Sequence, residues 1–241
     1  MLLQPLTLPT PEENLALDEA LLDAAEAGEA GETLRVWESP APVVVLGRAS
    51  RATEEAAADA CERRGVPVLR RVSGGAAIVA GPGCLMYAVV LSIRARPHLS
   101  DLNSAHALVL DRLAEATRLA GVKATRDGIS DLVINDNRRR KFSGNSLRVK
   151  RDWLLYHGTL LYRFDLELIA TLLGTPPRQP AYRAGRPHDA FVVNLGVDAD
   201  ALRAGLAEAW SVGPAAIDYP ANRVAELVRT RYTRDDWNRS R

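Results

Sequence analysis

Two arginines and two glycines stand close together in RRVSGG, residues 70–75, between two strand-like runs. Arginine presents a planar fork that matches phosphate or carboxylate oxygens, and glycine lets backbone N–H groups approach an anion closely. The pattern is that of a candidate anion site, although an ordinary glycine hairpin looks the same and a short Gly-rich turn alone does not separate the two. The candidate ligands are Arg71, Ser73, Gly74, Gly75 and the adjoining Ala76.

A second glycine-containing turn, GPGC at 81–84, follows the next short strand-like run. The two turns could line one cleft, because only AAIVA separates them in the sequence. A rigid turn made by Pro82 explains the same residues, and taken alone this element favours that interpretation.

The densest basic stretch is RRRKFSGNSLR, residues 138–148, which on its own reads as a solvated hairpin. Lys141 stands apart from its neighbours. A strand alternates its faces, so Lys141 and Ser143 share one side while Phe142 lies on the other, and Gly144 then opens the backbone. One lysine can therefore point into a site while the arginines stay in solvent.

Asp131 and His157 lie on neighbouring segments of the same predicted strand group. Asp131 stands ten residues before Lys141, on the preceding strand, and could hold Mg²⁺, which is commonly bound by one or two carboxylates and substrate phosphates. A turn carboxylate is the simpler interpretation of Asp131 alone. His157, followed by Gly158, is predicted to line the site and not to act as a base; a half-buried structural histidine is the alternative.

The composition restricts the class of protein. With 241 residues and 47% hydrophobic residues, the chain can form one large domain, and a net charge of +1 provides no general field for nucleic acid or an anionic membrane. Two cysteines and four scattered histidines predict neither a disulfide framework nor a zinc site. The N-terminus lacks a basic start and no long apolar run follows, so we expect a soluble, cytoplasmic protein.

Helix signals are clearest near the N-terminus. Thr10, Pro11 and Glu13 predict a capped helix over 11–27 that stops at Gly28. Asn14 and Asp18 fall on the leucine stripe of this helix, where we expect them to face inward and to bond neighbouring backbone.

The remaining pattern predicts an α+β fold: mostly antiparallel sheets with helices packed against them. Strands are expected at 34–37, 43–47, 66–72, 76–80, 85–93, 131–134, 141–144 and 157–162. Helices are expected at 53–65, 105–120, 166–173, 199–210 and 221–229. The stretch 175–188 has no periodicity and is predicted to be a loop.

Taken together, the segments resemble the lipoate-protein ligase family, and the correspondences keep their order along nearly the whole chain. They are NLALDEALL (14–22), LRVWESPAPVVVLGR (34–48), RRVSGGAAIV (70–79), GISDLVI (128–134), KFSGNSLR (141–148), HGTLLY (157–162), NLGV (194–197) and LVRTRYTRDDWN (227–238).

The resemblance implies the α+β catalytic domain shared with biotin-protein ligases, spanning residues 1–241 as one domain without a C-terminal accessory domain. It implies an enzyme that activates lipoate, or a related medium-chain acid, with ATP and Mg²⁺ and passes it to a lysine of a lipoyl-carrier protein, such as a lipoyl domain or a glycine-cleavage H-like protein. A separate accessory polypeptide is a further partner to consider. By the same resemblance, Arg71, Ser73, Gly74 and Gly75 would bind acyl and phosphate groups. Asp131 would serve the nucleotide and its metal, and Lys141 would hold the acyl-phosphate junction.

The chain departs from the family pattern in the glycine turn. Ala76 replaces a third glycine, and Ala80 and Gly81 replace a His-Asp pair, so the preferred acid and the use of ATP are open at this point. One alternative is an octanoyltransferase that works through a cysteine thioester, although Cys61 and Cys84 stand at neither of the family's cysteine positions. Another is a non-catalytic protein that binds lipoylated carriers.

Overall fold

The computed structural model describes residues 1–174, 179–216 and 218–240. Within these ranges seven strands form the larger sheet, in the spatial order β1-β2-β6-β10-β9-β8-β7, and every neighbouring pair except β1 and β2 is antiparallel. The strands are β1 (Leu2–Gln4), β2 (Thr33–Glu38), β6 (Cys84–Ser92), β7 (Ala124–Asp127), β8 (Asp131–Ile134), β9 (Lys141–Val149) and β10 (Trp153–Leu161). The predicted α+β class with mostly antiparallel pairing is confirmed.

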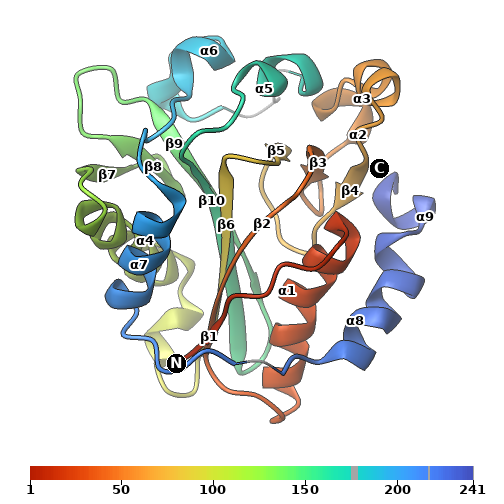
Figure 1. Cartoon of the computed structure of the whole chain (residues 1–241), viewed down its shortest axis with the longest axis vertical. Helices are drawn as coiled ribbons and strands as arrows, with labels where there is room; N and C mark the ends of the chain where they lie inside the picture. Colours follow the sequence, from red (N-terminus) through yellow and green to blue (C-terminus); the bar gives the residue numbers. More distant parts are fainter. Residues whose placement is uncertain (175–178, 217, 241) are drawn as a thin grey trace.

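Both faces of this sheet are covered, as Figure 1 shows. Along β6, Met86, Ala88 and Val90 pack into one hydrophobic core, while Tyr87 and Val89 pack into a second core on the other face. This double burial explains why β6 reads as an uninterrupted apolar run and not as an alternating one.

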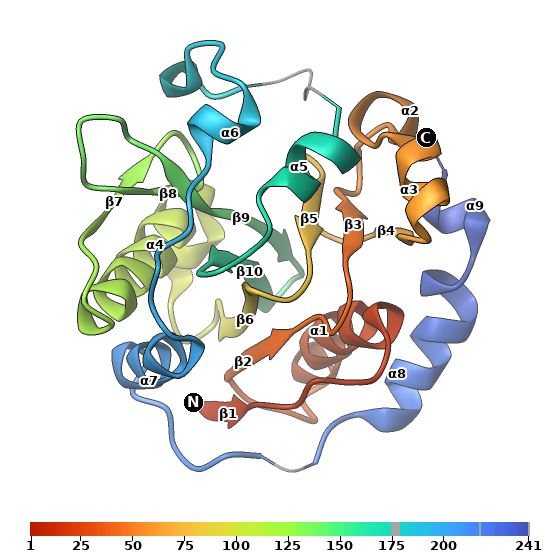
Figure 2. The same ribbon diagram turned by 45° about the horizontal axis from the view of Figure 1, so that its top comes forward.

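A smaller sheet lies over one face of the larger one. Its three strands have the order β4-β3-β5, with β3 (Val43–Leu46) parallel to β4 (Val68–Arg70) and antiparallel to β5 (Ile78–Ala80). Its valines and Leu46 belong to the same core as helix α1, so the small sheet and α1 cover the large sheet together (Figure 2).

Helices complete both sides. Helix α1 contacts β6 and β10 on one face of the large sheet, and α4 packs with α7 on the other. The helices are α1 (Pro11–Glu26), α2 (Ala52–Glu55), α3 (Ala58–Arg64), α4 (Leu102–Leu119), α5 (Glu167–Leu172), α6 (His188–Phe191), α7 (Ala199–Ala209), α8 (Ala221–Leu227) and α9 (Asp235–Asn238). Short 3₁₀ turns span Pro97–Ser100 and Ala181–Arg183, and a π-helical turn spans Val228–Tyr232. Among the described residues, every helix is too short or too polar to cross a membrane.

The start of α1 confirms the predicted cap. The Thr10 hydroxyl accepts from the backbone N–H of Glu13, and the Glu13 carboxylate accepts from the backbone N–H of Thr10, which is a complete capping box. The helix ends at Glu26, and Gly28 follows with a φ of 79°. The cap fixes where the polar residues of α1 point, including Asn14 and Asp18.

The single helix expected at 53–65 is wrong. Ala56 and Ala57 separate α2 from α3, and Ala56 is extended because it pairs with Leu173 in an isolated bridge. The backbone N–H of Ala57 donates to the carbonyl of Leu172. A tertiary contact with the end of α5 therefore interrupts a stretch whose local sequence favours helix.

The strand boundaries also differ from the prediction. Strands β9 and β10 form one long hairpin over 141–161, where the sequence indicated two short strands, and β1 and β7 were not predicted. β7 was missed because it is a polar edge strand in which Thr125 and Arg126 are exposed and the other two residues are half-buried. Of the loop expected at 175–188, residues 175–178 lie outside the described residues, and a 3₁₀ turn lies at Ala181–Arg183.

Candidate active site

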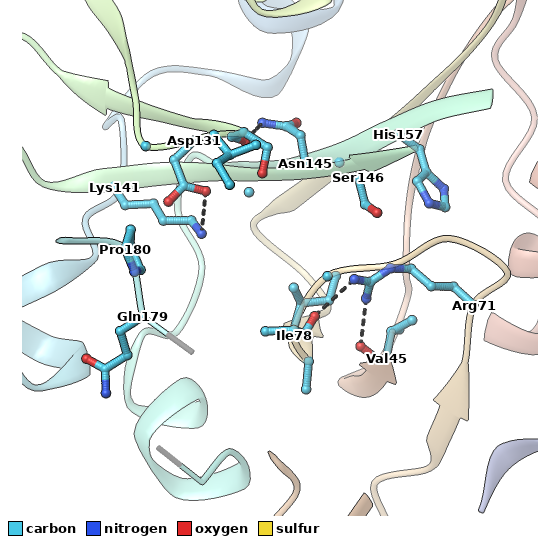
Figure 3. Close-up of a pocket in the computed structure, with 18 of the residues that line it drawn as sticks. Val45, Arg71, Ile78, Asp131, Lys141, Asn145, Ser146, His157, Gln179 and Pro180 are labelled. Atoms are coloured by element: carbon cyan, nitrogen blue, oxygen red, sulfur yellow. Dashed lines mark hydrogen bonds and ion pairs between the residues drawn. The ribbon is translucent and has the colours of Figure 1, made fainter. Parts of the chain in front are cut away.

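A cavity of about 570 Å³ opens between the small sheet and the β8–β10 end of the large sheet. Figure 3 shows Arg71 and Val45 on one side of it and Lys141 and Asp131 on the other. Its apolar lining comes from α1, both sheets and the 71–78 segment, and most of its polar lining comes from the β8–β10 strands, with Arg71, Ser130 and Gln179 in addition. The apolar lining includes Leu15, Val45, Ala77, Ile78 and Met86, and the polar lining includes Asp131, Lys141, Asn145, Ser146 and His157.

The 71–76 segment, here called the glycine loop, is held by Arg71. The Arg71 guanidinium donates to the Ser73 hydroxyl (3.1 Å) and to the backbone carbonyls of Val45 (3.0 Å), Gly74 (2.5 Å) and Ala76 (3.0 Å). Burial lowers the pKa of Arg71 to about 10, with Glu55 opposing this shift. Arg71 is thus a clamp on the loop's backbone, and the loop presents Gly75 and Ala76 to the cavity.

Gly75 shows why the loop needs glycine. Its φ is 84°, a conformation that residues with a Cβ rarely adopt. Its carbonyl oxygen would lie 1.9 Å from a Cβ at Gly47, so the loop packs directly against the backbone that follows β3. Two glycines therefore allow the loop to close down on the small sheet.

We expect Arg71→Lys to destabilise the protein. Lysine keeps a positive charge but has no planar fork, so it cannot reach four acceptors on both sides of the loop. Each buried carbonyl left without a donor costs about 1 to 3 kcal/mol, and the free energy of unfolding in guanidinium should fall by about 2 to 4 kcal/mol. Arg63→Lys, at an exposed position on α3, is the matched control. A parent-like unfolding free energy for Arg71→Lys would mean that these bonds do not hold the loop.

On the opposite side, Lys141 and Asp131 form an ion pair with 2.8 Å between Nζ and Oδ1. The Tyr182 hydroxyl donates to the other carboxylate oxygen at 2.7 Å, and Asp131 is 7% exposed. Burial, followed by the Asp131 charge, raises the pKa of Tyr182 far above its ordinary value, so this hydroxyl stays a donor. The ion pair brings β8 and β9 together beside a register shift between Leu132 and Val133.

Gly144 gives the Lys141 side chain its room. A Cβ at Gly144 would lie 2.9 Å from Lys141 Nζ and 3.0 Å from Cε. The predicted interpretation of KFSG, a lysine turned toward a site beside a glycine that opens the backbone, therefore agrees with the geometry. The ammonium side chain remains 27% exposed.

Asn145 was not predicted. Its amide donates to the carbonyl of Ser130 at 2.8 Å, and the Tyr87 hydroxyl donates to its oxygen at 2.6 Å. A Cβ at Gly158 would lie 2.0 Å from the same oxygen, so Asn145 leaves room only for glycine at position 158. Its position directly after Gly144 in the strand was the available signal. Tyr182, also missed, stands in a stretch with no periodicity and gave no signal.

His157 lies on the cavity wall, and Ser73 lies behind it. The two side chains are 2.5 Å apart between Nε2 and Oγ, and the other ring nitrogen is 3.4 Å from Asp18 Oδ2. The order Ser73, His157, Asp18 resembles a nucleophilic triad. Ser73 is only 1% exposed and, among the described residues, is absent from the lining of the cavity, so its oxygen cannot meet a substrate there.

A second cavity of about 150 Å³ adjoins the first and shares Ala76, Ala77, Ile78, Lys141, Gly144 and Pro180 with it. Ser143 lines this second cavity, together with apolar residues such as Phe142 and Phe191. Lys141 therefore stands at the boundary of two connected spaces.

Most of the sequence-predicted site residues come together. The residues that line the larger cavity are Arg71, Gly75, Ala76, Asp131, Lys141, Gly144, His157 and Gly158. In the described part of the chain, Ser73 and Gly74 lie outside the lining of both cavities. The GPGC turn agrees with the favoured interpretation, a rigid turn: residues 81–84 lie outside the lining of the two described cavities, Gly81 packs on Pro42 and Phe164, and Gly83 packs on Arg163.

The donor set for a metal ion is small. Within the described ranges, no group of three or more His, Cys, Asp or Glu residues is placed to hold a metal. Asp131 is the acidic residue on the larger cavity's wall, and each of its oxygens already accepts one hydrogen bond. Since Mg²⁺ commonly takes one or two carboxylates and completes its shell with phosphates and water, Asp131 fits Mg²⁺ only together with a phosphate-bearing ligand.

Comparisons with known proteins agree with this architecture. A family model described as the lipoyl protein ligase A/B catalytic domain matches residues 10–201. The bi-partite lipoate protein ligase of Thermoplasma acidophilum, described with its E2 lipoyl domain, superimposes with a TM-score of 0.82 at 22% identity, covering 99% of this chain and 95% of that one. Protein Ta0514 of T. acidophilum with bound lipoic acid gives 0.81 at 21%, covering 100% and 99%. Lipoate-protein ligase A bound with ATP gives 0.80 at 23%, covering 99% and 98%. These structures share the fold of the chain.

Proposed function

The chain belongs to the lipoyl protein ligase A/B catalytic domain family, and from this premise we propose that it is an ATP-dependent lipoate-protein ligase. Its substrate is lipoate or a related medium-chain acid, which it activates as an acyl-adenylate and transfers to a lysine of a carrier protein. The bound lipoic acid and ATP of two proteins with the same fold support this choice of ligands.

One observation carries the proposal: the Lys141 ammonium lies at the boundary between the larger cavity, part of whose wall is apolar, and the smaller one. Leu15, Ile78 and Met86 offer an acyl chain an apolar wall in the larger cavity. A carboxylate at the polar end of that chain would meet the lysine from one side, and a phosphate would meet it from the other. A lysine between a carboxylate and a phosphate is well placed for the formation of a mixed carboxylic-phosphoric anhydride.

The reaction then follows from charge. A carboxylate oxygen attacks the α-phosphorus of ATP, the bond to the β-phosphate oxygen breaks, and pyrophosphate leaves. Lys141 stabilises the negative charge that gathers on the α-phosphate oxygens. In the second step the carrier's lysine amine attacks the acyl carbonyl, loses a proton, and displaces AMP. The glycine loop, held by Arg71, keeps Gly75 and Ala76 against the ligand.

Mg²⁺ would be held by Asp131 together with ATP phosphate oxygens, where it would withdraw charge from the phosphates. In the protein itself, Asp131 has a second task, because its Oδ1 holds the Lys141 ammonium in the cavity at 2.8 Å. Tyr182 fixes the carboxylate through its other oxygen.

For the partners, we propose a lipoyl domain or a glycine-cleavage H-like protein as the acyl acceptor, with residues 1–241 acting as one catalytic domain. The structure of a bi-partite ligase with its E2 lipoyl domain supports an acceptor of this kind. It also suggests a separate accessory polypeptide as a partner to test for the transfer step.

The thioester route of an octanoyltransferase is less well supported. Cys84 is fully buried, and burial, with Glu38, raises the pKa of its thiol far above the ordinary value. Cys61 is 2% exposed on α3, and burial raises the pKa of its thiol too. Both thiols stay protonated at neutral pH, whereas the thiolate is the nucleophile.

We therefore expect the double variant Cys61→Ala, Cys84→Ala to keep ATP-dependent acylation within about twofold of the parent, since an adenylate route needs no thiolate. Alanine is the suitable replacement because serine would bury a hydroxyl at both positions. The measurement supplies either free lipoate with ATP and Mg²⁺, or an octanoylated carrier without ATP, and follows the acceptor's mass. Acylation from the octanoylated donor alone, lost in the double variant, would establish the transferase in place of the ligase.

A protein that only binds lipoylated carriers is the remaining alternative. It has no evident use for a buried Asp131 that holds an ammonium at the meeting point of two cavities. The same experiment separates it, because a binder would leave the acceptor's mass unchanged with either donor.

A further inference from the structure

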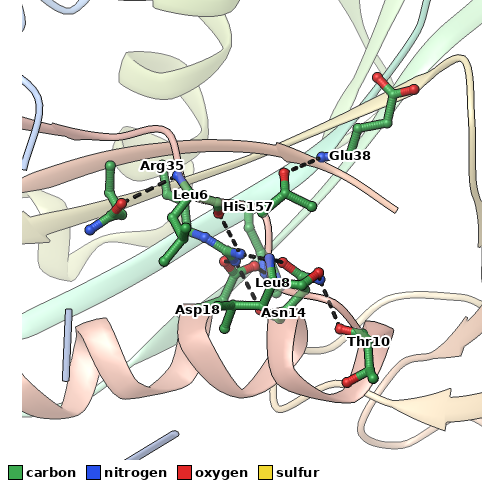
Figure 4. A network of polar contacts seen from close by, with 10 residues as sticks. Leu6, Leu8, Thr10, Asn14, Asp18, Arg35, Glu38 and His157 are labelled. Carbon is green, nitrogen blue, oxygen red and sulfur yellow. Dashed lines mark hydrogen bonds and ion pairs between the residues drawn. The ribbon is translucent and has the colours of Figure 1, made fainter. Parts of the chain in front are cut away.

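A buried chain of polar side chains connects α1 to the glycine loop, and the proposed reaction uses none of its inner members. Asp18 is 2% exposed and Arg35 is 0% exposed, and within the described residues both lie away from the cavity walls. Figure 4 shows Asp18 on α1, with Arg35 and His157 above it. From Asp18 the chain continues through His157 and Ser73 to the loop.

The Arg35 end of the chain is tightly fixed. Arg35 forms an ion pair with Asp18, donates to Asn14 Oδ1 at 2.6 Å, and donates to the backbone carbonyl of Leu6 at 3.1 Å. Asn14 in turn bonds the backbone of Leu8 in both directions, so part of its predicted role is confirmed. Burial by itself would raise the pKa of Asp18, but Arg35, with His157, keeps it below the ordinary value. Asp18 is therefore a carboxylate, which can only accept hydrogen bonds.

The loop end of the chain is fixed as well, because Arg71 can only donate. Its Nε donates to the Ser73 hydroxyl oxygen at 3.1 Å. Because Asp18 can only accept and Arg71 can only donate, the hydrogen bonds between them satisfy every group only when all of them point toward Asp18. The Ser73 hydroxyl then donates a hydrogen bond to His157 Nε2, and His157 Nδ1–H donates one to Asp18. This arrangement requires a neutral imidazole with its proton on Nδ1.

We propose that Asp18 is a positioning residue for the cavity: it fixes the Nδ1–H tautomer of His157, and His157 then holds Ser73 and the glycine loop in the conformation that receives the ligand. Asp18 acts at a distance, through two side chains. His157 lies on the cavity wall, and its contact with Ser73 ties it to the glycine loop, whose Arg71, Gly75 and Ala76 line the same cavity.

The variant Asp18→Asn reverses the chain. Arg35 can only donate, so it takes the amide oxygen and leaves the amide N–H₂ facing His157. Nδ1 must then accept, which moves the proton to Nε2 and gives the Ser73 oxygen two donors, from His157 and Arg71. An Asp-to-Asn change that produces the wrong histidine tautomer is known to cost activity in other sites without loss of geometry.

The test reads the tautomer directly, by ¹⁵N NMR of the imidazole in the ligand-free protein at pH 8. The protein has four histidines, so the signals of His157 are identified by their loss in His157→Gln. We expect the parent to carry the proton on Nδ1 and Asp18→Asn to carry it on Nε2. A parent protonated on Nε2, alone or with Nδ1, overturns the proposal. This reading is made on the parent protein, so it depends on no variant except His157→Gln, which serves only to assign the signals.

The effect on ligand binding rests on the proposed function and is measured separately, with lipoate in a calorimeter. Asp18→Asn should weaken lipoate binding about 10- to 100-fold in the parent protein. In a protein that already carries Ser73→Ala, adding Asp18→Asn should weaken binding far less, because Asp18 acts on the glycine loop through Ser73. Equal losses in both backgrounds would show that Asp18 does not act through Ser73. Failure of the parent to bind lipoate, with the Nδ1–H tautomer present, would count against the proposed substrate and not against the chain.

Discussion

Lys141→Ala should slow acyl-adenylate formation by at least about 100-fold. The loss should approach about 1000-fold if the lysine acts mainly on the transition state. In the proposed reaction the ammonium would lie where charge gathers on the phosphate, and neither the Asp131 carboxylate nor the Tyr182 hydroxyl can supply a positive charge in its place. The fold should survive, because the Lys141 side chain is 27% exposed and Asp131 keeps its bond from Tyr182. Adenylate formation is followed by pyrophosphate release at saturating ATP and lipoate.

Lys123→Ala is the matched control for this prediction. Lys123 is exposed just before β7 and lies outside the lining of both described cavities, so its loss changes the charge by the same amount without touching the site. Both variants should unfold near the parent's midpoint. A Lys141→Ala protein that made adenylate as fast as Lys123→Ala would remove Lys141 from the reaction.

Asp131→Asn should be nearly as damaging, with about a 100-fold loss of adenylate formation, since a displacement of the order of 1 Å in a reacting group can cost that much. The amide keeps the size of the side chain but loses the charge that holds Lys141. If the amide oxygen stays on the ammonium, which can only donate, the N–H₂ group faces Tyr182, whose hydroxyl must then accept the hydrogen bond that it now donates. The expected signature is a lower kcat with a raised Mg²⁺ requirement.

The control here is Asp136→Asn, in the turn between β8 and β9. Asp136 pairs with Arg140 and lies outside the lining of the two described cavities. It tests whether a lost carboxylate on the same hairpin matters in general. An unchanged Mg²⁺ titration in Asp131→Asn, with an unchanged kcat, would contradict both roles given to Asp131.

The elements that the sequence predicted well are those whose local signals agree with their tertiary environment. The cap formed by Thr10 and Glu13 and the apolar run of β6 both depend on neighbouring residues or on complete burial. The split between α2 and α3 could not be predicted, because it depends on the pairing of Ala56 with Leu173, more than a hundred residues away. The polar edge strand β7 gave no apolar alternation to detect.

For the site, the residue types indicated which residues lie together, but the roles of some of them could not be predicted. Lys141 and Asp131 were predicted in one site and form an ion pair there. Arg71 was predicted as an anion ligand, and the structure shows four of its hydrogen bonds going to Ser73 and to backbone carbonyls. Chemistry indicates what a guanidinium can bind, whereas only the fold shows which acceptors are nearest. The buried partners of Asp18 were hidden for the same reason.

Whether this cavity joins an acid to a nucleotide is tested most directly by one measurement. The purified protein is incubated with ATP, Mg²⁺ and lipoate, with octanoate in parallel, and the products are read by mass spectrometry. We expect lipoyl-adenylate or octanoyl-adenylate together with an equal amount of pyrophosphate, in the absence of any carrier protein. If ATP remains intact with both acids while an acceptor domain is acylated from an acylated carrier donor, the chain is not an adenylate-forming ligase.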